Sequence, residues 1–472
     1  MRTLFKGGTI YDGTGRRPFT GDVLIEDDHI EKVAESIEDK ADKTIDISGF
    51  QICPGLIDAH SHNDFFYDRE DAEKFYRPFI EQGITTQITG NCSFSPFGVD
   101  EDTPYRDKIG GGLFDTLHPC SFAEFKKRAE GNLYVNLVPL IGQGSVRAGM
   151  TGYDPSPYTE EQIENELAHV LEAMEGGAFG GSLGFMYEPD RYAREDEIIA
   201  FAKEIAKYDG IVTIHPRACS IVSADYPLLT KKSHLEMGLD EAVDIMHKSG
   251  CSLEYSHLIF TGQRSWKLLD KMLSTFHREH YTGNPIAFDN YAFHYGASVI
   301  TVVFPEWYAQ LSKEEAAKPV NRRKLELTIL MYRKVLGIDW DDIVHRLMND
   351  ELSVFMTDAW VEEKGLQNIA AFQTFPQFFI LAKKYGIPIE KIVRKMTGKT
   401  ADRYRIPERG YLREGYKADI TVIDLDNMKV DESKPDFRPG GIVHVYVNGH
   451  PVLQNGEYKG GKAGKVVLKN KR

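Results

Sequence analysis

The sequence has little cysteine, no long apolar run and no excess of positive charge. Five cysteines are scattered through 472 residues, which does not fit a disulfide framework and predicts a reducing, cytoplasmic location. The opening MRTLFKGGTIYDGTG lacks the apolar core of a signal peptide, and no segment approaches the ~20 apolar residues of a membrane span. Acidic residues outnumber basic ones by 71 to 57, a net charge of −14, which disfavours binding to nucleic acid or to an anionic membrane. The expected partner is a small molecule; the oligomeric state stays open.

The two ends of the chain look alike and differ from the middle. Short strand-like segments separated by glycines and charged turns fill both ends, and Asn448-Gly449 between apolar runs is typical of a hairpin. We therefore predict a small β-sandwich domain formed by residues 1–53 together with 408–472. The basic tail, GKAGKVVLKNKR, is expected to be a solvated terminus.

The middle of the chain, residues 54–407, alternates short strands with amphipathic helices. The eight strand candidates are QICPGLIDAHSH, TTQITGNC, LYVNLVPLIG, GGSLGFMY, IVTIHPR, SLEYSH, PIAFDNY and SVFMTDAW. Helices are expected between most of them, one after the capping box Thr159-Glu-Glu-Gln162 and others near Glu195–Asp209 and Leu239–Ser249. Eight such units in series predict a (β/α)8 barrel. A doubly wound open sheet is the alternative, but no GxGxxG motif favours it.

A long stretch at about 293–350 separates the seventh strand candidate from the eighth. It carries helical patterning, as in LELTILMYRKVLG and WDDIVHRLM. An insertion at that place of a barrel is a candidate lid. The alternative is a surface elaboration without a role in the site.

The motif PGLIDAHSHND ends the first strand candidate of the barrel. Because alternate residues of a strand face the same way, Asp58, His60 and His62 share one face. Two histidines at this spacing can bind one metal ion from the same side. Taken alone, an HxH motif is more often a pair of surface or packing histidines.

Other strand candidates also end in residues of metal-ligand type. Cys92 ends the second, His215 the fifth, His257 the sixth and Asp358 the eighth. Each has an ordinary explanation by itself: a small buried residue for the cysteine, core histidines, and a helix cap for the aspartate. In a barrel, however, all strand ends open on one face, so six candidate ligands would converge there. His294, shortly after the seventh strand, is left open.

These motifs resemble the amidohydrolase superfamily, and most closely its D-aminoacylase branch of N-acyl-D-amino-acid deacylases. The resemblance rests on PGLIDAHSHND, TTQITGNC, the strand-end histidines and aspartate, and the tail pattern from Lys399-Thr-Ala-Asp to Gly415-Tyr-Lys-Ala-Asp419. The fourth strand, GGSLGFMYEPD, has no lysine to bridge two metals, so a cysteine is the natural substitute. The resemblance implies a tightly held zinc on Cys92, His215 and His257, and a second, weaker position on His60, His62 and Asp358.

The activity that the resemblance implies is zinc-dependent hydrolysis of a C–N amide bond, most simply the deacylation of an N-acyl-D-amino acid by a metal-bound hydroxide. Asp358 is expected to be the catalytic acid and base that moves a proton from the attacking water to the leaving amine. One alternative is hydrolysis of a cyclic amide or lactone at the same metal site. Another is a catalytically silent, amidohydrolase-like binding protein, which the intact set of ligands disfavours.

Three residues are expected to bind substrate: Tyr187, Arg217 and Tyr291. The alternative for each is that it holds other site residues in place without contacting the substrate. Two features depart from the branch, because Ile259 replaces its usual lysine and Ala370-Ala-Phe-Gln-Thr-Phe-Pro-Gln377 replaces its His-Pro-Arg stretch. Without these cations a plain N-acetyl-D-amino acid is a doubtful substrate, and a more apolar site is expected. The nearby aromatic residues in the sequence are Phe260, Phe293, Phe372 and Phe375.

Overall fold

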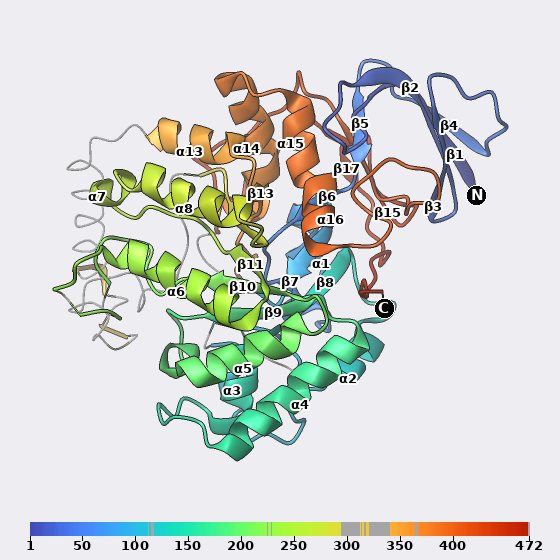
Figure 1. Cartoon of the computed structure of the whole chain (residues 1–472). Helices are drawn as coiled ribbons and strands as arrows, with labels where there is room; N and C mark the ends of the chain where they lie inside the picture. Colours follow the sequence, from blue (N-terminus) through green and yellow to red (C-terminus); the bar gives the residue numbers. More distant parts are fainter. Residues whose placement is uncertain are drawn as a thin grey trace.

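Eight parallel strands form a barrel at the centre of the chain (Figure 1). The computed structural model describes residues 1–470 apart from 112, 115–117, 224, 228, 294–311, 313, 316–317, 321–339 and 364–366. In chain order the barrel strands are β6 (Leu56–Asp58), β7 (Ile84–Thr89), β8 (Asn136–Gly142), β9 (Gly180–Gly184), β10 (Ile211–His215), β11 (Ser252–Tyr255), β12 (Ile286–Asn290) and β13 (Ser353–Phe355). The N–H of Ala59 donates to the carbonyl of Phe355 (3.1 Å), which joins the first strand to the last. The predicted (β/α)8 barrel is confirmed.

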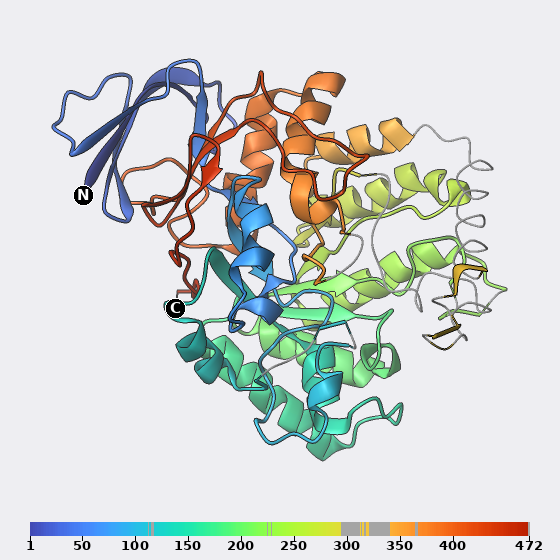
Figure 2. The same cartoon turned by 180° about the vertical axis from the view of Figure 1, so that it is seen from behind.

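Helices cover the barrel from outside, as Figures 1 and 2 show. The described helices are α1 (Glu73–Ile80), α2 (Phe122–Ala129), α3 (Gln143–Thr151), α4 (Glu160–Gly176), α5 (Glu195–Ala206), α6 (His234–Ser249), α7 (Gln263–Trp266), α8 (Leu269–Tyr281), α13 (Trp340–Asn349), α14 (Ala370–Tyr385), α15 (Ile389–Met396) and α16 (Gly398–Tyr404). Within the described ranges, no helix combines the length and the apolarity needed to cross a membrane.

Capping explains where two of these helices begin and end. The capping box predicted for α4 is present, with the Thr159 side chain accepting from the Gln162 N–H, and the helix ends at Gly177 in the left-handed conformation. Helix α6 begins at His234, five residues before the predicted start, because Ser233 and Glu236 form a second capping box that the sequence analysis missed.

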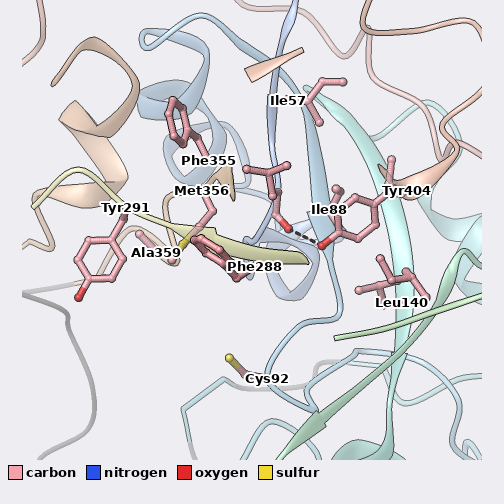
Figure 3. Packing of buried hydrophobic residues seen from close by; sticks show 14 of the residues in the cluster. Ile57, Ile88, Cys92, Leu140, Phe288, Tyr291, Phe355, Met356, Ala359 and Tyr404 are labelled. Carbon is pink, nitrogen blue, oxygen red and sulfur yellow. Dashed lines mark hydrogen bonds between the residues drawn. The ribbon is translucent and has the colours of Figure 1, made fainter. Parts of the chain in front are cut away.

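The main core lies between the barrel strands and the surrounding helices. Figure 3 shows part of it, including Ile88, Phe288, Phe355 and Tyr404. The Tyr404 hydroxyl donates to the carbonyl of Ala59 at 3.4 Å. This bond links α16 to the residue that immediately precedes His60 of the HxH motif.

Strands from both ends of the chain form a second sheet of nine strands, which confirms the predicted β domain. They are β1 (Arg2–Ile10), β2 (Phe19–Glu26), β3 (His29–Ala34), β4 (Lys43–Asp46), β5 (Gln51–Pro54), β14 (Ile420–Ile423), β15 (Ile442–Val447), β16 (His450–Gln454) and β17 (Glu457–Tyr458). The two halves meet where β5 pairs with β14, and side chains of both halves share one apolar core. Asn448 and Gly449 both have positive φ in the hairpin between β15 and β16. The boundaries of this domain in the sequence, 1–53 and 408–472, stay predictions.

The basic tail differs from its prediction as a solvated terminus. It lies along the start of β8, where the N–H of Leu137 donates to the carbonyl of Lys465 (2.9 Å) and the N–H of Val467 donates to the carbonyl of Leu137 (2.8 Å). Val467 is buried. The backbone and Val467 attach the tail to β8, and Lys469 adds to the attachment because its Nζ donates to the carbonyls of Tyr208 (2.8 Å) and Asp209 (2.6 Å).

The predicted lid, about 293–350, falls mostly outside the described residues. Helix α13 is its last part. A lid function therefore stays a prediction.

Candidate metal centre

Six side chains from five strand ends meet at the mouth of the barrel. The Cys92 sulfur lies 3.2 Å from His60 Nε2, 3.4 Å from His215 Nδ1 and 3.7 Å from His257 Nε2. The Asp358 carboxylate lies 3.4 Å from the same Nε2 atom of His60 and 3.4 Å from Nε2 of His62. Ligand atoms of His60, Cys92, His257 and Asp358 all lie within 4.8 Å of one another. The structure thus brings together all six residues that the sequence singled out as candidate ligands.

Three of these residues have an uncommon backbone conformation. Cys92, His257 and Asp358 have φ angles of 51°, 35° and 47°, values that few residues other than glycine adopt and that cluster at functional sites. Each follows the end of a strand, where a sharp turn directs the side chain into the mouth. The turn before Cys92 also needs Gly90, since a Cβ there would collide with the carbonyl of Leu140.

Burial sets the protonation of the cluster. It lowers the pKa of His60, His62, His215 and His257, and the neighbouring His257 lowers that of His215 further. The imidazoles are therefore neutral near pH 7 and offer lone pairs. Burial raises the pKa of the Cys92 thiol well above its usual value, so a bound cation is needed to favour the thiolate.

Asp358 behaves differently from the other buried acids of the barrel. Burial alone would raise its pKa, but the neighbouring imidazoles of His60 and His257 and a hydrogen bond with His62 hold that pKa below its ordinary value. It is therefore a carboxylate at neutral pH.

The set of donors fits a metal ion. A thiol, four imidazoles and a carboxylate line the mouth, four of them with ligand atoms within 4.8 Å of one another, and thiolate and imidazole are ligands that Zn²⁺ prefers. Figure 3 shows Cys92 apart from the packed apolar side chains of the barrel.

Buried acids lie behind the cluster. Asp58 accepts from the Thr357 N–H (2.9 Å) and hydroxyl (2.7 Å), which links β6 to the turn that carries Asp358. Burial raises the pKa of Asp58 to about 7. Asp289, at the end of β12, contacts His60 and His257; sequence analysis missed it because no motif marks it.

The predicted substrate residues lie in different surroundings. The Tyr187 ring is 4.7 Å from the His215 ring, edge to face. Tyr291 follows β12 and is buried, which raises the pKa of its hydroxyl. Arg217 forms an ion pair with Glu241 of α6 (3.0 Å) and lies over the Phe185 ring. Its charge therefore already has a partner within the protein.

Aromatic residues flank the cluster, and two of them were not among those expected. Phe114 stacks on His62 with ring centroids 5.4 Å apart, and Trp360 meets both His62 (5.7 Å) and Phe114 (4.9 Å) edge to face. Of the expected residues, Phe375 lies buried within α14 and contacts Phe378 edge to face. Phe114 and Trp360 lie outside regular elements, where periodicity gives no signal.

Comparisons with known proteins agree with this geometry. The profile of the amidohydrolase family matches residues 51–452. The D-aminoacylase of Alcaligenes xylosoxydans xylosoxydans is 27% identical, over 99% of this chain and 97% of that protein. The N-acyl-D-aspartate deacylase of the same organism is 25% identical, over 98% and 94%. A crystal structure of the N-acyl-D-glutamate deacylase from Bordetella bronchiseptica, complexed with zinc and a phosphonate inhibitor, shares the fold with a TM-score of 0.83 at 21% identity, covering 99% of both chains. The chain belongs to the amidohydrolase family, in the branch of the D-aminoacylases.

Proposed function

We propose that the protein is a zinc-dependent hydrolase that removes the acyl group from N-acyl-D-amino acids or related linear amides. The observation that carries this proposal is the cluster of one thiol, four imidazoles and one carboxylate at the mouth of a (β/α)8 barrel. The names of the relatives, D-aminoacylase and N-acyl-D-aspartate deacylase, support the choice of substrate class. A cytoplasmic location is part of the proposal, and the five unpaired cysteines support it.

Two linked positions would hold metal. Cys92, His215 and His257 would hold one ion tightly, because the cysteine supplies a negative charge and its sulfur lies beside both imidazoles. The remaining three candidates, His60, His62 and Asp358, would form a second, weaker position, in keeping with the contacts of Asp358 to both histidines. A bound Zn²⁺ polarises a carbonyl group and lowers the pKa of water from ~15.7 to about 7.

Asp358 would move the proton. It takes a proton from the water whose oxygen adds to the acyl carbon, and it gives that proton to the nitrogen as the C–N bond breaks. The products are a carboxylic acid and a free amine. Asp358 is ionised at neutral pH, so it has a lone pair available to accept the proton. General acid–base catalysis of this kind contributes roughly 10²–10⁴-fold.

Substrate binding is proposed for Tyr187 and Tyr291, at the rim next to His215 and at the end of β12. The ion pair of Arg217 with Glu241 means that a substrate carboxylate would have to compete for this guanidinium. Phe114 and Trp360 beside His62 favour a substrate with an apolar group. These features support N-acyl compounds larger and less polar than an N-acetyl-D-amino acid.

The test is a hydrolysis screen with metal analysis on the same preparation. N-acyl D- and L-amino acids with short and long acyl groups are assayed beside hydantoins and lactones. The proposal expects stoichiometric zinc and preferred cleavage of the N-acyl-D compounds. Cleavage of cyclic substrates alone would assign the site to ring opening, and protein free of metal after growth in zinc-replete medium would favour a binding protein without activity.

A further inference from the structure

Asp289 lies behind the cluster of candidate ligands, and each of its two carboxylate oxygens contacts one of the histidines. It is the next-to-last residue of β12, and its side chain is fully buried. Its Oδ2 lies 3.3 Å from Nδ1 of His60, and its Oδ1 accepts the backbone N–H of His257. One carboxylate from the seventh barrel strand therefore contacts candidate ligands from the first and the sixth.

The ring of His60 has partners at both nitrogens. Its Nδ1 faces Asp289, while its Nε2 faces the Cys92 sulfur and the Asp358 carboxylate. The three other imidazoles differ. Among the described residues, one ring nitrogen of each lacks a hydrogen-bond partner: His62 Nδ1, His215 Nε2 and His257 Nδ1.

This geometry selects one tautomer of His60. An ionised Asp289 carboxylate can only accept, so in the bond with ionised Asp289 the proton is on Nδ1 of His60, and the lone pair of Nε2 is left facing the thiol and Asp358. A carboxylate bound behind a histidine fixes the ring and makes it a better ligand. The second oxygen adds a constraint on His257, whose φ of 35° is an uncommon conformation that the hydrogen bond to its N–H supports.

We propose that Asp289 is a positioning residue of the metal centre, which holds His60 in its Nδ1–H tautomer and anchors the turn that presents His257. This inference rests on the proposed function, because it assumes that the cluster binds zinc. Asp58 does not share this role, since the bonds of its side chain go to Thr357, Gln87 and the backbone of His60.

The test compares the zinc affinity of D289A and D289N with that of the wild type, by chelator competition after metal removal. Loss of such a partner typically weakens metal binding about 10–100-fold, and D289A is expected in that range. D289N should lie between, because its amide oxygen can accept only one of the two N–H groups well. The matched control is E254Q, which alters an equally buried carboxylate that pairs with Arg403 and forms no hydrogen bond with an imidazole of the described residues; it should leave zinc affinity unchanged.

A second measurement needs no variant. In zinc-loaded wild-type protein labelled with ¹⁵N-histidine, NMR should show His60 protonated at Nδ1 and not at Nε2. An Nε2–H tautomer for His60, or D289A and D289N proteins that bind zinc as tightly as the wild type, would overturn the inference and leave the proposed function intact. Wild-type protein that fails to bind zinc would remove both.

Discussion

At the scale of single residues, the six candidate ligands fall into two groups around His60. The Cys92 sulfur lies on the side of His215 and His257, and the Asp358 carboxylate lies on the side of His62. The sulfur is the donor of its group that can become anionic, because the residues beside it are neutral imidazoles. The carboxylate is the group best suited to carry a proton.

Cys92→Ala is expected to lose metal and activity together. The substitution removes the only anionic donor beside His215 and His257, so both zinc content and turnover should fall at least tenfold. Metal analysis and an amide-hydrolysis assay on one preparation check this. Cys120→Ala is the matched control, because Cys120 is also buried and its thiol faces the carbonyl of Pro96; it should keep its zinc.

Asp358→Asn is expected to keep the tightly bound zinc and lose most turnover. Cys92, His215 and His257 are unchanged in this variant, whereas the amide cannot accept the proton of the attacking water. A fall in kcat of roughly 10²–10⁴-fold is expected. Near-normal turnover would show that another group moves the proton.

Sequence analysis could find the six ligands because each stands at the end of a strand candidate and strand ends share one face of a barrel. It could not find Asp289, since its importance comes from contacts with His60 and His257, far away in the sequence. It also could not place Phe114 and Trp360 beside His62, because loop conformation decides where they lie. The partner of Arg217 was equally hidden, as Glu241 reads as an ordinary helix-surface residue.

At the scale of elements, buried charge couples strand β11 to helix α16. The Arg403 guanidinium pairs with the buried carboxylate of Glu254 (2.7 Å) and donates to the Ser252 hydroxyl (2.8 Å). Burial nevertheless outweighs this pairing and raises the pKa of Glu254 to about 7. The Glu254 carboxyl group therefore binds its proton more tightly in the folded protein than in the unfolded chain.

This shift predicts that stability falls as the pH rises from about 4.5, the ordinary value, towards 7. Between these values the folded state binds more protons than the unfolded state, so the free energy of unfolding declines as the pH rises. The decline due to Glu254 is at most about 3 kcal/mol, and above pH 7 this group contributes no further change. E254Q should flatten that part of the profile. Denaturant melts from pH 4.5 to 8 check it, and an identical slope in the variant would assign the loss to other groups.

The attachment of the tail to β8 predicts a difference between two neighbouring residues. Val467 is buried, whereas Leu468 is 41% exposed. Val467→Ala should lower the free energy of unfolding by about 1–2 kcal/mol, and Leu468→Ala should lower it less. Equal effects in urea melts would show that the tail is not held in solution as it is in the structure.

At the scale of the whole molecule, the candidate metal site depends on the closed barrel. The ligands come from β6, β7, β10, β11 and β13 or from the turns after them, so a bound ion links strands around the barrel. The overall fold was predictable because strand and helix patterns repeat along the chain. The tail and the start of α6 were not, because backbone bonds and a capping box decide them.

Metal removal is expected to lower the melting temperature of the whole protein. A ligand that binds only the folded state stabilises it, by about 4 kcal/mol at a thousand times its Kd. Calorimetry with and without chelator measures the shift. For Cys92→Ala, the melting temperatures with and without chelator should be equal. A shift in this variant as large as that of the wild type would point to a zinc site elsewhere.

The pairing of β5 with β14 has a consequence for synthesis. Cys53 and Thr421 meet in that pairing although 368 positions separate them in the chain. At about 5–20 residues per second, a ribosome needs roughly 20–70 seconds to supply the second strand after the first. During that time the early strands expose an unpaired edge, so the nascent chain should depend on chaperones that shield such edges until translation ends.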